Sequence, residues 1–228
     1  MAAPIGHIYL ALRLLAGPLH GIDEQAFLIG TSFPDIRYWI HAPREYTHIP
    51  VKELSDILKE PNAFRAGMLF HSFVDNKRYK FFEKHPLNKA ISLANINGYL
   101  MKNTEDIVLF PLLTDKSFVK YFDKILPEET ALVHDSSLVR RWHVQLQNYF
   151  LQGPTAPLVS TMLCPNGEKP NRFKQMAIAI FCATSKRLAA LKTVRDNILA
   201  FYDNFDVIVH TAPAVHEKTL PNLAHAPA

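Results

Sequence analysis

The sequence predicts an all-α protein with a single compact multi-helix domain. Of its 228 residues, 48% are hydrophobic and 20% are charged, a balance that favours a packed core over disorder. Phe is frequent, with 15 copies, and Gly is scarce, with 8. Large side chains and few glycines suit packed helices better than short strands joined by tight turns. We expect the domain over residues 1–209 and a loosely ordered tail over 210–228, where prolines recur without apolar periodicity.

The charge and the cysteine content indicate which partners and which cellular compartment to expect. The net charge of +4 suits a phosphate-bearing substrate or an anionic membrane surface. Cys164 and Cys182 are too few for a disulfide framework. His7, Tyr9 and Arg13 interrupt the apolar run that a signal peptide needs, and no stretch has the length of a membrane span. We therefore expect a cytoplasmic protein, or one exported without a cleaved signal peptide.

The first quarter of the chain predicts a helix followed by two irregular links. Apolar residues at helical spacing predict a helix over residues 5–15, which Gly17 and Pro18 end. A short apolar segment then breaks at Pro34. Because proline disfavours helical geometry in the residue before it, we expect Asp35 to follow an extended link.

The central helix follows this region. Residues 41–50 read as a loop, and residues 50–59 as a modest helix. Asn62 is a suitable N-cap for a helix that spans residues 64–79 and continues to about residue 84.

The second half of the chain predicts further helices. We expect apolar helical segments over residues 87–101, 104–113 and 118–126. Ser136 or Ser137 is expected to cap a helix that carries His143. The four prolines of residues 153–171 predict a long loop. Apolar residues then recur with helical period over residues 173–205, with Lys and Arg on the other side, which predicts one long amphipathic helix or two joined by a bend. The apolar side is Met176, Ile180, Phe181, Thr184, Leu188, Leu191, Val194, Ile198 and Phe201.

The central helix carries a polar pair on an otherwise apolar surface. His71 and Asp75 are four residues apart and so share one face, and Gly67, one turn earlier, leaves room there for a close approach. A buried imidazole or carboxylate without a partner costs about 2–7 kcal/mol. A satisfied internal hydrogen bond or a shared metal ion would each remove that cost.

Three further residues extend this pair into a candidate ligand set. His7 opens the first predicted helix, Asp35 follows Pro34, and His48 lies in the loop after it. Nitrogen and oxygen ligands without a thiolate suit zinc, manganese or iron. The sequence therefore predicts a metal site between the helices.

Four motifs, all in about the first 85 residues, resemble those of the zinc-dependent phospholipase C family, which is related to the P1-type nucleases. Each of its members is an all-helical protein with a zinc cluster. The motifs are a small-residue segment with a His that opens the first helix, a Gly-x-x-x-Pro-Asp segment, a Thr-His pair and a Gly-x-x-x-His-x-x-x-Asp helix. They stand here as Gly6-His7-Ile8-Tyr9-Leu10-Ala11, residues 30–35, Thr47-His48 and residues 67–75.

The resemblance implies a hydrolase of phosphodiester or phosphoester bonds with one to three zinc ions or another divalent transition metal. It implies metal ligation by His7, Asp35, His48, His71 and Asp75, with Asp35 also acting as the base that orients the attacking water. The family has another His after the Asp of the central helix, where this chain has Asn76 to Tyr79. It also has a His-x-x-x-Glu pair, for which His143 and Gln147 stand here, and His134 is a candidate substitute ligand.

Two other functions remain open at this stage. One is a nuclease or nucleotidase on the same scaffold, and the other is a non-catalytic helical interaction protein, which Gln147 favours because a neutral amide binds zinc poorly. The first expectation for a substrate is a phospholipid head group, with peripheral membrane contact, and nucleic acid is less favoured.

Overall fold

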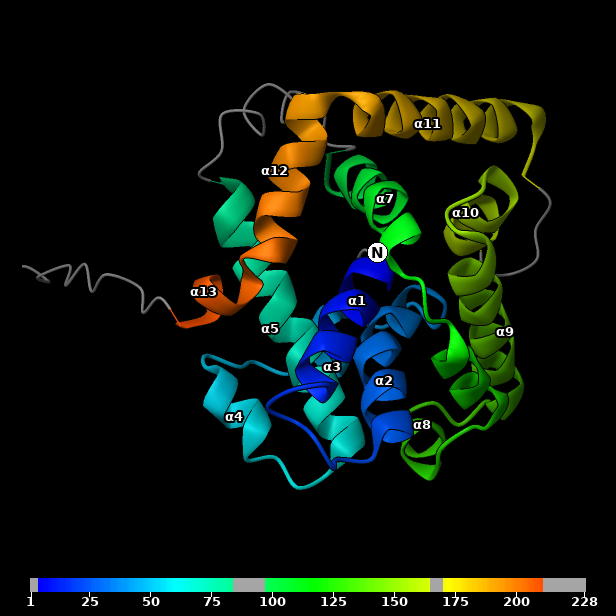
Figure 1. Ribbon diagram of the computed structural model, residues 1–228. Coiled ribbons are helices and arrows are strands. Elements are labelled where there is room, and N and C mark those ends of the chain that lie inside the picture. The colour runs from blue at the N-terminus through cyan, green and yellow to red at the C-terminus, as the bar shows by residue number, and fades with distance from the viewer. Residues whose placement is uncertain (1–3, 84–96, 165–169, 211–228) are drawn as a thin grey trace, which may run out of the picture.

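The computed structural model describes residues 4–83, 97–164 and 170–210, and all the regular structure in these ranges is helical (Figure 1). The predicted all-α class is thus confirmed. The predicted C-terminal tail lies outside the described residues, apart from His210. The α-helices are α1 (Pro4–Leu15), α2 (Glu24–Ser32), α3 (Arg44–Thr47), α4 (Leu54–Leu58), α5 (Ala63–Glu83), α7 (Asn97–Leu109), α8 (Pro127–Leu132), α9 (Ser136–Gln152), α10 (Ala156–Leu163), α11 (Arg172–Ala190), α12 (Lys192–Asp203) and α13 (Phe205–His210). The 3-10 helices are η1 (Phe33–Tyr38), η2 (Phe110–Leu112) and η3 (Ser117–Asp123).

Helices α2 and α5 cross with their backbones in contact. A Cβ atom placed on Gly30 would lie 2.0 Å from the Phe64 carbonyl oxygen, and one on Gly67 would lie 2.2 Å from the Phe27 carbonyl oxygen. Only residues without a side chain allow this approach. The close approach predicted at Gly67 is confirmed, and the backbone of α2 is what approaches.

The chain around Pro34 differs from the expectation. Helix α2 runs directly into η1, and Phe33, the residue before the proline, has φ −64° and ψ −38°, which is helical. The predicted extended link is therefore wrong. Pro34 lies in the first turn of η1, where its missing N–H leaves no hydrogen bond unmade. The 3-10 helix η1, in place of an extended link, therefore sets the direction of the Asp35 side chain.

The N-termini of α5 and α9 are capped by an amide and an acidic side chain. Asn62 caps α5 as predicted, because its Oδ1 accepts a hydrogen bond from the Arg65 N–H (2.8 Å). The cap of α9 is Asp135 in place of the predicted serines. Its carboxylate accepts from the N–H groups of Ser137 (2.9 Å) and Leu138 (3.1 Å), and its backbone is extended.

Several predicted segments have other boundaries in the structure. The loop over 41–50 contains α3, the helix over 50–59 shortens to α4, and the loop over 153–171 contains α10. Helix α7 is continuous through the break predicted between 101 and 104, residues 84–96 are not described, and the segment 118–126 is mainly the 3-10 helix η3. The C-terminal segment 173–205 is two helices with a bend, because Leu191 takes an extended ψ of 120°.

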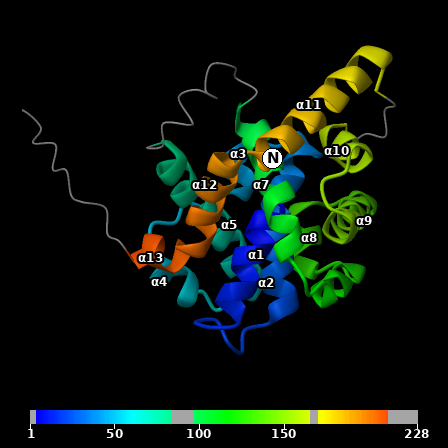
Figure 2. The same cartoon turned by 45° about the horizontal axis from the view of Figure 1, so that its top comes forward.

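Helices α12 and α13 close the fold over α5. The ring of Phe205 meets the rings of Phe70 (6.3 Å between centroids) and Phe73 (6.4 Å) edge-on. Arg13 of α1 donates to the Tyr202 carbonyl (2.5 Å), which ties the first helix to α12. Figure 2, turned by 45°, shows α12 beside α5 and α11 along the outside of the bundle. Within the described ranges, no helix is both long enough and apolar enough to cross a bilayer.

Candidate metal centre

Four separate elements bring the five N-terminal ligand candidates together. His7 lies in the first turn of α1, Asp35 in η1 and His48 at the end of α3, while His71 and Asp75 share one face of α5. All five are largely buried. Two groups of three have their donor atoms within 4.8 Å of one another, and His71 belongs to both. The groups are His7 with His71 and Asp75, and Asp35 with His48 and His71.

The His71 ring is fixed by the α2–α5 crossing. Its Nδ1 lies 2.9 Å from the Thr31 carbonyl oxygen, which only an N–H can satisfy, so Nδ1 carries the proton. The other nitrogen, Nε2, is buried, has no hydrogen-bond partner among the described residues and presents a lone pair. A carbonyl that fixes the tautomer in this way is the usual outer partner of a metal-bound histidine.

His48 is fixed in the same manner by its neighbour. The Thr47 hydroxyl donates to the Pro34 carbonyl (2.8 Å), so its oxygen accepts from Nδ1 of His48 (3.0 Å). The proton therefore sits on Nδ1, and Nε2 of His48 is buried with no hydrogen-bond partner in the part of the chain that the structure describes. Two imidazole lone pairs thus face the cluster. A network in which the side chains satisfied one another by hydrogen bonds would give each of these nitrogens a partner.

The spacing of the donor atoms is longer than hydrogen bonding allows. Asp75 oxygens lie 3.6 Å from Nε2 of His7, 3.8 Å from Nε2 of His48 and 3.9 Å from Nε2 of His71. Nitrogen–oxygen hydrogen bonds end near 3.2 Å. Two atoms that each lie about 2.1 Å from one zinc ion in a tetrahedron are about 3.4 Å apart. Nε2 of His7 also lies 3.3 Å from the His71 carbonyl oxygen, so the separations that favour shared ligation over direct pairing most clearly are those at His48 and His71.

Two cations face Asp75. The guanidinium of Arg44 donates to Oδ2 (2.8 Å), and Nζ of Lys102 lies 3.9 Å from Oδ1. Burial by itself would raise the pKa of Asp75, but Lys102, the neighbouring imidazoles and the Arg44 hydrogen bond hold that pKa well below its usual range. Asp75 is therefore an anion at neutral pH, as a metal ligand must be.

Asp35 also faces His71, with its Oδ1 4.0 Å from His71 Nε2. Burial opposes ionisation, yet the His71 ring and Lys102 lower the pKa of Asp35 to about 2. Burial and the Asp35 carboxylate raise the pKa of nearby Tyr38. The Tyr38 ring meets that of Tyr99 (6.5 Å between centroids), which is 41% exposed. Aromatic side chains thus lead from the surface toward Asp35.

Stability of the metal-free protein is expected to fall as the pH is lowered from 7 toward 4. Burial lowers the pKa of His71 to about 3 and that of His48 to about 4, from an ordinary value of 6.5. The unfolded chain therefore takes up protons that the folded chain resists, so acidification favours unfolding below pH 6.5. We expect a loss of about 1–2 kcal/mol per pH unit, measured by urea denaturation with chelator present.

The matched controls for this measurement are His71→Gln and His20→Gln. The first should flatten the pH dependence, and the second, at an exposed position, should leave it unchanged. An equal pH dependence of the unfolding free energy in the two variants would contradict its assignment to the buried histidines.

The two later histidines do not join the cluster. His143 is buried, but its Nε2 pairs with Glu129 (2.7 Å) and its Nδ1 bonds the Phe122 carbonyl (3.0 Å), so both ring nitrogens are used. His134 is exposed and lines a surface groove of about 420 Å³ beside Tyr46. Gln147 donates to Asp123 (2.8 Å) on η3. Neither histidine belongs to a described donor group. His143 lies on α9, which packs on η3 and α8, and His134 precedes that helix at the surface.

The sequence did not single out Lys102. Lys102 stands on α7, 27 positions after Asp75 in sequence, and only the packing of the helices places its amine near the carboxylate. Arg44 lies in the predicted loop over 41–50, but nothing in the sequence linked it to Asp75. Thr31 and Pro34 accept hydrogen bonds through their backbone carbonyls. Because every residue has a carbonyl, the sequence does not indicate these contacts.

The fold and the site together define an all-α protein with a buried histidine–aspartate cluster between its N-terminal helices. Comparison of the chain with protein-family models, with curated proteins and with solved structures gave no match.

Proposed function

We propose that this protein is a metal-dependent hydrolase of phosphodiester or phosphoester bonds, with a phospholipid head group as the first substrate to test. The observation that supports this most is the pair of buried Nε2 atoms of His48 and His71, which have no hydrogen-bond partner within the described ranges and lie beside the Asp35 and Asp75 carboxylates. The resemblance of the first 85 residues to the zinc-dependent phospholipase C family stays a prediction, as does the identity of the metal.

The donor set fits a borderline metal ion such as zinc. Imidazole nitrogens and carboxylate oxygens suit it, and the Thr31 carbonyl and Thr47 hydroxyl orient the two rings. His7, His71 and Asp75 would hold one ion, and Asp35, His48 and His71 describe a second position that shares His71. When bound, such an ion supplies a water of lowered pKa and neutralises phosphate oxygens.

The chain's own side chains have separate roles in this proposal. Asp35 stays ionised because of its low pKa, so it accepts a hydrogen bond from the attacking water and orients it. Lys102 presents an ammonium group at the same cluster, within reach of an anionic phosphate oxygen. Arg44, half-exposed at the surface, adds a second positive charge there.

The proposal is tested first by metal content and then by activity. Protein purified without chelator should contain at least one equivalent of a divalent transition metal by elemental analysis. It should hydrolyse p-nitrophenylphosphocholine or bis-p-nitrophenyl phosphate, and chelator should abolish the reaction. Protein without bound metal that also gains no activity on metal addition would leave the non-catalytic interaction protein as the better description.

Asp35→Asn is expected to lower hydrolysis about a hundredfold or more, because the amide cannot accept the water's proton. The control is Asp135→Asn, which changes an exposed helix cap to an equally good one. Rates are compared at saturating metal, so that weaker ligation by the amide is compensated. A wild-type rate for Asp35→Asn would remove Asp35 from the chemistry.

A nucleotidase on the same scaffold is the second candidate. It is favoured by the half-exposed ring of Tyr99, which meets Tyr38 beside Asp35 and offers a face for a nucleobase. Comparison of dinucleotide and phosphocholine esters separates the two functions. Replacement Tyr99→Ala should then weaken only the dinucleotide reaction if a base stacks there.

A further inference from the structure

Helix α11 buries only part of the apolar side that its pattern predicts. The recurrence that includes Met176 and Ile180 predicts these residues in the core, but they are 55% and 59% exposed. The buried side of α11 consists of Ile178, Cys182, Ser185 and Ala189. The prediction is therefore wrong for Met176, Ile180 and Leu191, which is 53% exposed, and confirmed for Phe181 and Leu188, which pack against the core.

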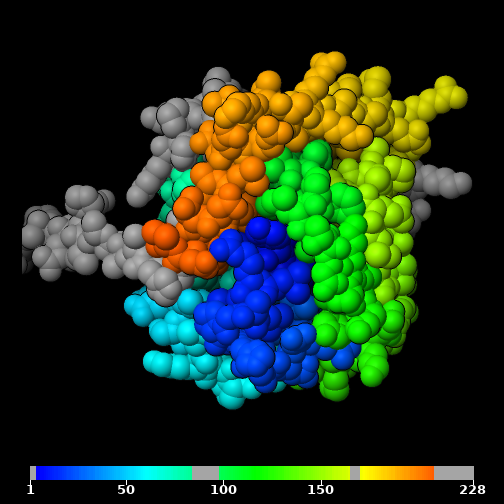
Figure 3. Space-filling view, viewed as in Figure 1, coloured from blue at the N-terminus to red at the C-terminus, as the bar shows by residue number. Residues whose placement is uncertain are grey.

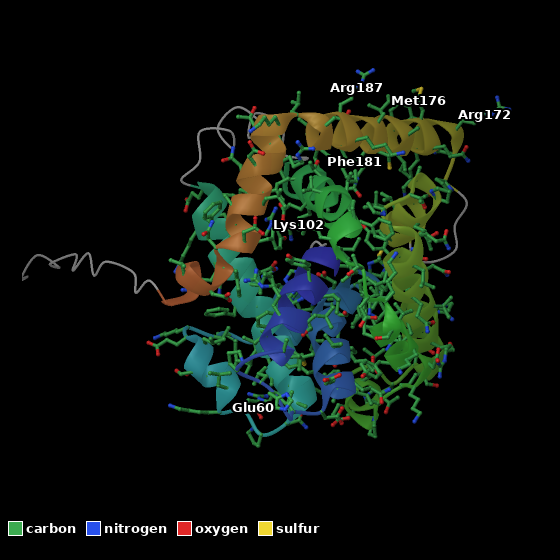
Figure 4. All side chains as sticks on the ribbon, viewed as in Figure 1. Glu60, Lys102, Arg172, Met176, Phe181 and Arg187 are labelled. Carbon is green, nitrogen blue, oxygen red and sulfur yellow. The ribbon has the colours of Figure 1, made fainter. Side chains whose placement is uncertain are left out.

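The outward side of α11 carries an apolar stripe. Phe173 is 76% exposed, and Met176 and Ile180 follow it at intervals of three and four residues, so the three side chains lie on one face over about 10 Å. Figure 4 shows Met176 directed away from the body of the protein and Phe181 directed toward it. Figure 3 shows the side chains of α11 projecting from the edge of the molecule. Among the described residues, this stripe includes the most exposed large apolar side chain.

Positive charge accompanies the stripe. Helix α11 contains Arg172, Lys174, Lys186 and Arg187 and no acidic residue. Its four positive charges equal the net charge of +4 of the whole chain. Arg187 follows Ile180 by seven residues on the same face, and Figure 4 shows it directed outward with Met176. An apolar stripe among cations, with no anion, is the pattern of a helix that lies in a membrane interface.

We propose that α11 is a peripheral docking surface for an anionic lipid membrane. Phe173, Met176 and Ile180 insert between the lipid head groups, and the arginines and lysines contact lipid phosphates. Charge favours this partner over a second copy of the chain, because two α11 helices would bring eight cations together without a counter-charge. The proposal rests on the surface of α11 alone and is independent of the metal centre.

The test is binding of the full chain to lipid vesicles. We expect binding to vesicles of phosphatidylcholine with phosphatidylglycerol, much weaker binding to phosphatidylcholine alone, and a decrease with added salt. The triple variant Phe173→Ser, Met176→Ser and Ile180→Ser should bind at least about tenfold more weakly. The matched control replaces the exposed apolar residues Val144, Leu151 and Val207 by Ser and should bind as the wild type does.

A second measurement reports insertion directly. The native Trp39 and Trp142 are buried, so in Phe173→Trp only the new indole is open to quenching by brominated lipid. Strong quenching is expected. No quenching, or equal binding by both triple variants, would overturn the proposal. So would a dimer that the α11 variant alone converts to a monomer, since the stripe would then join two copies of the chain.

Discussion

Replacing His71 by Ala is expected to remove both metal positions at once. His71 is the one residue shared by the two donor groups, and its Nε2 faces both carboxylates. Loss of an outer partner of a metal ligand typically costs 10–100-fold in affinity, and loss of a shared ligand should cost more. We therefore expect the metal content of the variant to fall to background and hydrolysis to fall to the uncatalysed rate.

The matched control is His143→Ala. Both residues are 1% exposed, and both changes remove the same side-chain atoms. Removing His143 leaves Glu129 buried without its partner, so this variant is also destabilised. It should nevertheless keep its metal. Equal metal content in the two variants would contradict the assignment of the centre.

Thermal unfolding gives a readout that does not depend on activity. A metal ion present at about a thousand times its dissociation constant stabilises the folded state by about 4 kcal/mol. Chelator should therefore lower the unfolding temperature of the wild type and of His143→Ala, and should have no effect on His71→Ala.

Replacing Gly67 by Ala is expected to destabilise the protein strongly. The new methyl group would lie 2.2 Å from the Phe27 carbonyl oxygen and 2.6 Å from the Thr31 nitrogen, so helices α2 and α5 must separate. Overpacking of this kind typically costs 1–3 kcal/mol, and rigid backbone on both sides places this site at about 3 kcal/mol or more. Urea denaturation followed by circular dichroism measures the loss.

The control for this change is Gly98→Ala. Gly98 lies in the first turn of α7, and no atom of the described residues lies within 4 Å of an added Cβ. Alanine there should raise stability by about 0.5–1 kcal/mol, since it favours the helix and restricts the unfolded chain. If Gly67→Ala were as stable as Gly98→Ala, the backbone contact between α2 and α5 would be wrong.

The same crossing also positions the site. Gly67 lies one turn before His71 on α5, and Thr31, whose carbonyl holds the His71 ring, directly follows Gly30 on α2. A separation of the two helices would therefore release the ring. For this reason Gly67→Ala should weaken metal binding as well as stability.

The sequence by itself determined the helical class, the cap at Asn62, the close approach at Gly67 and the five residues that converge. These depend on local rules, since helical period, capping chemistry and residue spacing act over a few residues. It misjudged the link before Asp35, because the strain at a residue before proline is small beside the burial of Phe33 in the core.

Tertiary structure decided which side of each helix is covered and which distant groups meet. Lys102 reaches Asp75 from another helix, and His143 is committed to Glu129, because packing brings these pairs together across long stretches of chain. In α11 apolar residues lie on both sides of the helix, so helical periodicity alone does not indicate which side is buried. The choice came from the neighbouring helices, which bury Ile178 and leave Met176 outside.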